Sequence, residues 1–331
     1  MTELPPEPRQ NVLGSIKSVM DKIFQDKPKA TPPVSSTPPH APALQPKRPH
    51  ISATKIEQCV DYCGYAYYLR YVLKKASPPT SAFLKGSSVH AGAEENFKQK
   101  IKSFQDLSKA KVQEISISAF ETRFKAEGIS MSKDEDSTGL SLTLAAAKDR
   151  TAALSALYSE NVAPVHQPVL VEEFQKIRLN DELDLLVRLD LINDQDKIVD
   201  LKTSKRSWTQ QQLDKSFQFD IYGLAYRAIY KKDPAGVITE NLVDTGKNTK
   251  HVQLCGFRSD VHFKRAIKKI NDFLYMTEKE IFQPAAKGSW WCSDSACSFA
   301  RECKYFQWYQ RGGGNVKRPF WMNRKKKEVK K

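Results

Sequence analysis

The chain has 331 residues, of which 40% are hydrophobic and 27% are charged. This apolar content is enough to bury a core, and no apolar run approaches the ~20 residues of a membrane-spanning helix, which excludes integral membrane association. The formal net charge of +15 favours a polyanionic partner, either a nucleic acid or an anionic membrane surface. Six cysteines in so long a chain, with no apolar leader after Met1, indicate a reducing, intracellular compartment.

The first 50 residues are rich in proline and contain 11 of the 18 prolines of the chain. Because proline removes a backbone donor and breaks helices, we expect residues 1–50 to form a disordered tail. Within this tail, residues 12–24 place apolar side chains at helical spacing and predict a short amphipathic helix. Such a helix either packs on its own globular domain or docks on a partner protein, and both alternatives are open.

The other end of the chain is strongly basic. Residues 315–331 follow three glycines and contain eight lysine or arginine residues and one acidic residue. We expect residues 311–331 to be a flexible tail, either simply solvated or binding DNA phosphates through residues such as Lys325, Lys326 and Lys327. The folded domain is therefore expected over residues 51–310.

The most informative segment predicts a β-hairpin. Residues 183–192 and 197–203 are apolar runs with interspersed charges, separated by a turn composition. Asp190 lies on the first strand and Asp200 on the second, so cross-strand pairing can bring their carboxylates to one face. Two buried like charges repel unless a cation lies between them, which predicts a Mg²⁺ or Mn²⁺ site. Lys202 shares the face of Asp200, where its ammonium can orient a water or stabilise developing phosphate charge.

Two helical patterns flank this hairpin. Residues 83–97 form the first, and it contains His90, either a further ligand of the cation or a packed core histidine. Residues 207–230 predict one long helix, on which Gln218 and Tyr222 lie at positions i and i+4 and share a face.

Taken in order, these motifs resemble the RecB-type branch of the PD-(D/E)xK nuclease superfamily over about residues 51–306. The motifs are Gly86-x-x-x-His90, Asp190, Asp200-x-Lys202 and Gln218-x-x-x-Tyr222. The resemblance implies an α/β fold with a restriction-endonuclease-like core, in which helices flank a central mixed β-sheet.

The same resemblance implies roles for the residues. The side chains of His90, Asp190 and Asp200 would bind one or two divalent cations. Lys202 would serve catalysis, and the Gln218–Tyr222 helix would hold either DNA or the lysine. The chain departs from the family pattern at Val187, where a glycine is common, and in having Asp200 where glutamate is commoner.

A group of cysteines predicts a second metal centre. Cys292, Cys297 and Cys303 lie within twelve residues, and both zinc and an iron–sulfur cluster normally take four ligands. The fourth ligand is expected to be Cys59 or Cys63, whereas Cys255 is typical of a small buried strand residue.

CRISPR-associated RecB-like exonucleases and the AddB-type nucleases, which the chain resembles, close a [4Fe–4S] cluster with one early and three late cysteines. The resemblance implies a cluster ligated by Cys63, Cys292, Cys297 and Cys303, with Cys59 as the alternative to Cys63. The late cysteines would form a lobe over residues 290–306 that ties the two ends of the domain together. Zn²⁺ is the alternative metal.

The expected function is metal-dependent hydrolysis of DNA, by resemblance an exonuclease acting on single-stranded ends in recombination, repair or replication. The sequence has no Gly-x-x-x-x-Gly-Lys-Ser/Thr motif, so unwinding would need a separate helicase. The helix at 12–24 would tether the nuclease to that helicase or to a single-strand binding protein. A cytoplasmic protein of a bacterium or phage is expected. The alternatives are a non-catalytic DNA-binding or assembly subunit and a basic membrane-surface protein.

Overall fold

The computed structural model describes residues 49–310. The helix expected at 12–24 and the basic tail with Lys325, Lys326 and Lys327 lie outside the described residues. No helix within the described range has the length and apolar character needed to cross a membrane.

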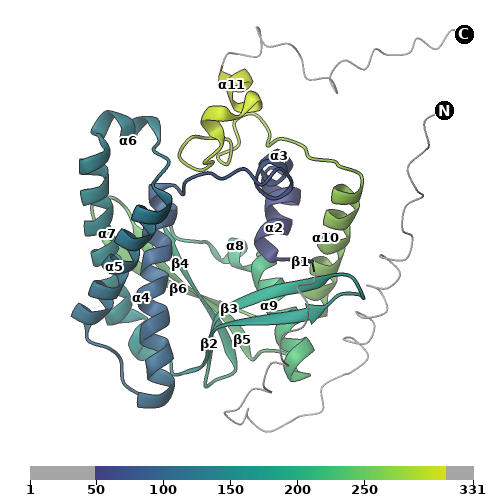
Figure 1. Cartoon of the computed structure of the whole chain (residues 1–331). Coiled ribbons are helices and arrows are strands. Elements are labelled where there is room, and N and C mark those ends of the chain that lie inside the picture. The colour runs from purple at the N-terminus through teal and green to yellow at the C-terminus, as the bar shows by residue number, and fades with distance from the viewer. Residues whose placement is uncertain (1–48, 311–331) are drawn as a thin grey trace, which may run out of the picture.

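A six-stranded mixed sheet forms the centre of the fold (Figure 1). Its strands are β1 His50–Ile51, β2 Pro168–Arg178, β3 Asp184–Asn193, β4 Lys197–Ser204, β5 Gly236–Asp244 and β6 Thr249–Gly256. They follow the order β1-β3-β4-β5-β6, and β2 pairs with β3 as well. The β2–β3, β3–β4 and β5–β6 pairs are antiparallel, whereas β1–β3 and β4–β5 are parallel.

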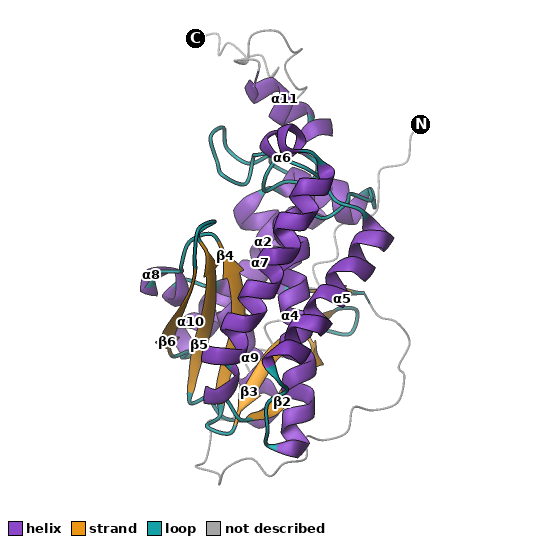
Figure 2. Ribbon diagram, turned by 90° about the vertical axis from the view of Figure 1, so that its left-hand side faces the viewer, coloured by secondary structure: helices purple, strands orange, loops and turns teal. Residues whose placement is uncertain are grey.

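Helices cover both faces of this sheet (Figure 2). On one face lie α4 Ser81–Ser103, α5 Lys109–Glu127 and α7 Leu140–Asn161, and the short helix α6 Lys133–Thr138 packs against α7. On the other lie α2 Ala53–Glu57, α8 Gln210–Asp214, α9 Phe217–Tyr230 and α10 Asp260–Glu278. Two apolar cores result, one between the sheet and α9 and α10, the other between the sheet and α4 and α7. The prediction of a mixed central sheet flanked by helices is confirmed.

Short helical segments complete the chain. These are the π-helices η1 Gln58–Tyr62 and η2 Tyr68–Val72, α3 Gly64–Tyr67, the 3₁₀ helices η3 Ala163–Val165 and η4 Ala300–Glu302, and α11 Lys304–Gln310. The hydroxyl of Ser52 accepts the Lys55 backbone N–H and caps α2, which positions the N-terminal helix against the sheet.

Two local expectations are wrong. The long helix expected over residues 207–230 is two helices, α8 and α9. It breaks because Ser216 adopts an extended backbone and its side chain caps α9 by accepting the Phe219 N–H. Cys255, expected to be buried, is exposed, because β6 is an edge strand that alternates between half-buried and exposed positions.

The second edge of β3 is shared by two neighbours. β1 pairs with Asp184 and Leu185 at one end, and β4 pairs with Leu191 and Ile192 at the other. Residues 186–190 therefore face a gap in the sheet between the two pairings. Backbone and side chains can reach this gap from both layers of helices, so it is the natural place for a site.

Candidate active site

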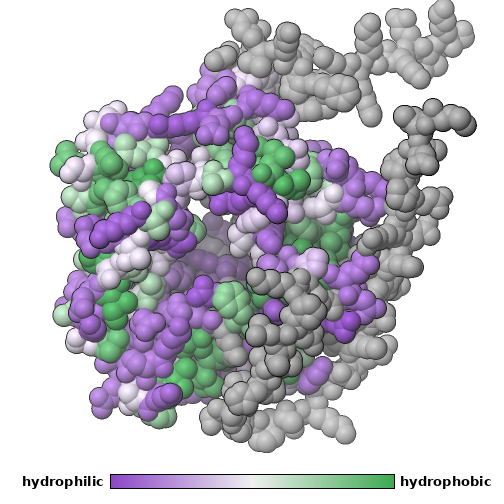
Figure 3. Space-filling view, in the orientation of Figure 1, coloured by the Kyte–Doolittle hydropathy of each residue, from purple (hydrophilic) through white to green (hydrophobic). Residues whose placement is uncertain are grey.

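A cavity of about 910 Å³ opens over this gap in the sheet. Residues of α2, α4, β2, β3, β4 and α9 line it, together with Arg123 of α5. Figure 3 shows the corresponding hollow near the centre of this face of the molecule. All six site residues predicted from the sequence, His90, Asp190, Asp200, Lys202, Gln218 and Tyr222, line the cavity.

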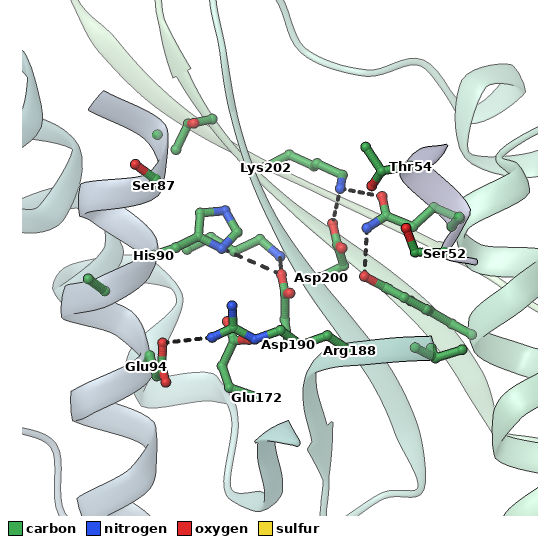
Figure 4. A pocket seen from close by; sticks show the side chains of 18 of the residues that line it. Ser52, Thr54, Ser87, His90, Glu94, Glu172, Arg188, Asp190, Asp200 and Lys202 are labelled. Carbon is green, nitrogen blue, oxygen red and sulfur yellow. Dashed lines mark hydrogen bonds and ion pairs between the residues drawn. The ribbon is translucent and has the colours of Figure 1, made fainter. Parts of the chain in front are cut away.

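Three potential metal ligands meet at the floor of the cavity (Figure 4). His90 Nδ1 lies 3.7 Å from Asp190 Oδ2. His90, Asp190 and Glu172 each present a ligand atom, and these atoms all lie within 4.8 Å of one another. Asp190 is also fixed by the Leu201 backbone, whose N–H donates to Oδ2 at 3.2 Å. The carboxylate thus accepts a strand N–H just beyond the end of the β3–β4 pairing, where Leu191 pairs with Val199.

Close helix packing places His90 at this floor. A Cβ added at Gly86 would lie 2.5 Å from Thr203 Oγ1, so a larger residue there would force the Thr203 hydroxyl to move. His90 follows Gly86 by four residues, slightly more than one helical turn, and therefore lies on the same face of α4. The Gly86-x-x-x-His90 spacing is explained by this contact.

The acidic side chains of the site are poorly stabilised as anions. Burial raises the pKa of Asp200 to about 6 and that of Glu172 to about 8, and it raises the pKa of Asp190 as well. Asp200 Oδ1 is buried and has no hydrogen-bond partner among the described residues. Burial lowers the pKa of His90 to about 4, so the imidazole is neutral at pH 7 and able to act as a ligand.

These properties fit a divalent cation. Carboxylate oxygens with one imidazole are a donor set suited to Mg²⁺ or Mn²⁺, and a bound cation would compensate the buried negative charge. The tight group contains Glu172, which the sequence analysis missed, in addition to His90 and Asp190. Asp200 lies beside the group and is held by Lys202 instead.

Lys202 is held by two acceptors. Its Nζ lies 2.7 Å from Asp200 Oδ2 and donates to Gln218 Oε1 at 2.6 Å. Gln218 Nε2 in turn donates to the Tyr222 hydroxyl at 2.6 Å. Burial alone would lower the pKa of Lys202, but Asp200 and Asp190 outweigh it and the pKa is raised. In this structure the Gln218–Tyr222 face of α9 therefore contacts the lysine.

Glu172 and Arg188 were not predicted, although both line the cavity. Arg188 forms ion pairs with Glu172 and, at 3.2 Å, with Glu94 of α4. The β2–β3 pairs Val171 with Leu191 and Glu173 with Leu189 place Glu172 opposite Asp190. One signal was present in the sequence: Glu172 follows an apolar run, as Asp190 and Asp200 do.

The cysteines gather in a separate region near the C-terminal segment. Cys63, Cys292, Cys297 and Cys303 line one small cavity together with aromatic and aliphatic side chains. Cys59 does not line this cavity and packs in the core between the sheet and α9. Burial raises the pKa of the Cys292 thiol to about 11 and also raises those of Cys297 and Cys303.

The surroundings of Cys63 fit a metal thiolate. Its Sγ accepts the Ala66 N–H at 3.4 Å and the Ala285 N–H at 3.3 Å. Backbone N–H groups directed at sulfur stabilise the negative charge of cysteine ligands in iron–sulfur and zinc sites.

Comparisons with known proteins bear on the whole domain. The model of the PD-(D/E)XK nuclease superfamily matches residues 50–304. Two similar solved structures are a candidate exonuclease from Eubacterium rectale and the protein SSO0001. The first is 11% identical over 82% of this chain and 90% of that chain, with a TM-score of 0.45. The second is 11% identical over 90% of this chain and 98% of that chain, with a TM-score of 0.34. The search of curated proteins found no match.

Proposed function

The chain belongs to the PD-(D/E)XK nuclease superfamily and is therefore a nuclease, and we propose that it is a metal-dependent exonuclease of the RecB-type branch acting on single-stranded DNA ends. The observation that carries this proposal is the cavity in which His90, Glu172 and Asp190 converge beside the Asp200–Lys202 pair.

We assign the cation to His90, Glu172 and Asp190, with Asp200 as a further ligand. A divalent cation bound there would supply Lewis-acid polarisation of a phosphate oxygen and would lower the pKa of a coordinated water. The chain itself excludes bulk water from Asp200, which is 1% exposed, and fixes Asp190 through the Leu201 N–H. Such fixed groups need no reorganisation when charge develops.

Lys202 stabilises the phosphate during attack. An ammonium has three N–H donors, and the Asp200 and Gln218 contacts use two of them within the described part of the chain. The third can donate to a phosphate oxygen in the cavity. Because Gln218 is itself held by Tyr222, the ammonium is oriented before substrate arrives.

The position of the C-terminal segment supports an exonuclease. Figure 1 shows this segment near the top of the view, between α3 and α6. Arg301 contacts α6 through an ion pair with Asp136, and the Ser77 hydroxyl donates to the Ser298 carbonyl at 3.0 Å. We propose that this segment lies over the path of the DNA strand, so that the strand enters by its end.

The cysteines are proposed to hold a [4Fe–4S] cluster, with Zn²⁺ as the alternative. The ligands would be Cys63, Cys292, Cys297 and Cys303, which join segments about 230 residues apart and would fix the C-terminal segment to the N-terminal helices. Anaerobically purified Cys63→Ser protein should lose the iron and sulfide that the wild type contains, whereas Cys59→Ser should keep them. A colourless wild-type protein with bound zinc would show that the cysteines hold Zn²⁺ and not an iron–sulfur cluster.

The nuclease activity can be tested with end-labelled linear and circular single-stranded DNA, and with duplex DNA, in Mg²⁺ or Mn²⁺. We expect the wild type to degrade linear single strands and to leave circles intact. Asp149→Asn, an exposed substitution on α7, provides a matched control for changes of acidic residues in the site. Cleavage of circles would show that the protein is an endonuclease. A folded chain that cuts no substrate would support the non-catalytic alternative.

The pathway and partner are proposed from the sequence. The helix at 12–24 would tether the nuclease to a helicase or a single-strand binding protein. Removal of residues 1–48, which leaves strand β1 intact, should leave cleavage of short oligonucleotides unchanged and abolish co-purification with that partner. Equal co-purification of both forms would contradict the tether.

A further inference from the structure

We propose that two aromatic–arginine pairs, Phe83 with Arg123 and Phe174 with Arg188, stack unpaired bases on two sides of the metal-ligand group. This inference rests on the proposed nuclease function and concerns its substrate. The stacking would make the enzyme select single-stranded DNA through contacts that paired bases cannot offer.

The first pair lies where α4 and α5 border the cavity. Phe83, in the first turn of α4, is 55% exposed although it is a large apolar side chain. The Arg123 guanidinium lies over its ring at 5.1 Å from the centroid. Both side chains line the cavity.

The second pair lies on the sheet. Phe174 of β2 is 58% exposed, and its cross-strand partner in the β2–β3 register is Arg188. The Arg188 guanidinium lies 5.2 Å from the centroid of the Phe174 ring. Arg188 also contacts Glu94 and Glu172, as Figure 4 shows for Glu94, so this pair is linked directly to the metal-ligand group.

The two pairs bracket the metal ligands. Phe83 precedes His90 by seven residues, which is roughly 10 Å along a helix. Phe174 follows Glu172 by two residues, which is roughly 7 Å along a strand. Nucleotides next to a phosphate bound by His90, Glu172 and Asp190 would therefore have their bases within reach of one ring or the other.

Phe83 and Phe174 differ from other exposed rings in that they line the cavity. Phe104, Phe257 and Trp290 are exposed as well, and none of these three lines it. In each pair the arginine lies over the ring, yet more than half of the phenylalanine stays exposed. A ring held by an arginine in this way presents an apolar surface to a base, and the guanidinium can also bind phosphate.

The chemistry favours single strands. Every base has a flat π-face, so stacking on an aromatic ring tolerates any sequence. In a duplex these faces are covered by neighbouring base pairs, and the base must leave the stack before it can contact a side chain. Two stacking positions around the scissile phosphate would therefore penalise duplex DNA without any base-specific hydrogen bond.

The test measures binding in an Asp200→Asn background, so that DNA is not consumed. Fluorescein-labelled oligo(dT) would be titrated with this protein and with versions carrying Phe83→Ala, Phe174→Ala, Phe83→Trp or Phe174→Trp. Phe104→Ala, at an exposed ring at the far end of α4, is the matched control. We expect each alanine substitution to weaken binding by roughly 5- to 100-fold, and each tryptophan substitution to retain it.

A second arm uses the same oligonucleotide with one abasic nucleotide moved along its length. Stacking predicts one position at which base loss weakens binding when Phe174 is present but not in Phe174→Ala, because the two changes remove the same contact. A second position should depend on Phe83 in the same way. Alanine variants that bind like Phe104→Ala, or abasic effects that stay at the same positions in both alanine variants, would overturn the proposal.

The two proposals fail separately. If Phe83→Ala and Phe174→Ala in the otherwise wild-type chain degrade single strands at the wild-type rate and bind normally, the stacking proposal falls and the nuclease stands. If the wild-type chain cuts no DNA, the proposed exonuclease falls, and the binding and abasic measurements still decide whether the rings stack bases.

Discussion

Two buried carboxylates on neighbouring strands of the sheet behave in opposite ways. Asp200 on β4 and Glu240 on β5 are 1% and 0% exposed, and the β4–β5 register pairs Leu201 with Glu240. Strand alternation sends the two side chains to opposite faces. Both carboxylates are buried, and they differ in the hydrogen-bond donors around them.

Glu240 is fully supplied with donors. His166 Nε2 lies 2.7 Å from its Oε1, His251 Nε2 lies 2.5 Å from its Oε2, and Gln253 Nε2 donates to Oε1 at 2.6 Å. Burial alone would raise the pKa of Glu240, but these donors lower it to about 2. A carboxylate of this kind is stable without any added cation and serves the fold.

Asp200 has the opposite character, with an unsatisfied Oδ1 and a pKa raised by burial to about 6. Its one strong partner is Lys202, which Gln218 also holds. A buried carboxylate with few hydrogen-bond donors, lying beside two further acids, is stabilised when a cation binds next to it. The comparison separates a structural acid from a functional one within one sheet.

The largest expected effect is on catalysis. Asp200→Asn should lower the rate of DNA degradation by at least on the order of 10³-fold, since several kcal/mol of transition-state stabilisation depend on the metal site. The melting temperature should stay equal or rise, because the substitution removes a buried charge that lacks donors. Single-turnover cleavage and thermal melting measure the two quantities. A much lower melting temperature of the variant would show that Asp200, like Glu240, is a structural acid.

Lys202→Ala should lower cleavage by about 10²- to 10³-fold, the cost of losing one preorganised charged donor in an active site. Mn²⁺ binding should persist in this variant, because Lys202 is not a ligand. Gln210→Ala on α8, a change of an exposed residue outside the cavity, is the control. Near wild-type cleavage by Lys202→Ala would remove the lysine from the mechanism.

Glu240→Gln should show the reverse pattern to Asp200→Asn. Replacing the anion weakens three charge-assisted hydrogen bonds in a buried network, which should lower the free energy of unfolding by about 3 kcal/mol. Cleavage per folded molecule should change less than twofold at low temperature. Urea unfolding and active-fraction-corrected rates test this. Loss of cleavage in a fully folded Glu240→Gln protein would contradict the structural role.

The stabilisation by Glu240 should also depend on pH. Its pKa is lowered from 4.5 to about 2 in the folded chain, while the unfolded chain keeps the ordinary value. The stabilisation is therefore complete above pH 4.5 and lost as the pH falls towards 2. Between about pH 5 and pH 3, the stability advantage of wild type over Glu240→Gln should shrink by about 2 kcal/mol. An advantage that stays constant over this range would show that Glu240 titrates normally.

Much of the site was predictable because it lies on local patterns. Two apolar runs around a turn predict the hairpin that carries Asp190 and Asp200. The helical spacing from Gly86 predicts the position of His90. Strand alternation correctly places Lys202 beside Asp200, and helical spacing places Gln218 beside Tyr222.

The rest depends on contacts between distant segments. Glu172 reaches the site through the β2–β3 register and a left-handed backbone conformation, with φ of +50°, neither of which has a clear sequence signal. The donors of Glu240 come from positions 166, 251 and 253, which only the tertiary fold brings together. A charged residue in the middle of the apolar strand β5 was the one available hint.

Calorimetric titration with Mn²⁺ tests the central claim most directly, namely that the acids of the cavity bind a cation and Glu240 does not. Wild type, Asp190→Asn and Glu240→Gln would be compared at one pH and salt concentration. We predict equal Mn²⁺ affinity for wild type and Glu240→Gln, and affinity at least roughly tenfold weaker for Asp190→Asn. The same Mn²⁺ affinity in all three proteins would contradict the account.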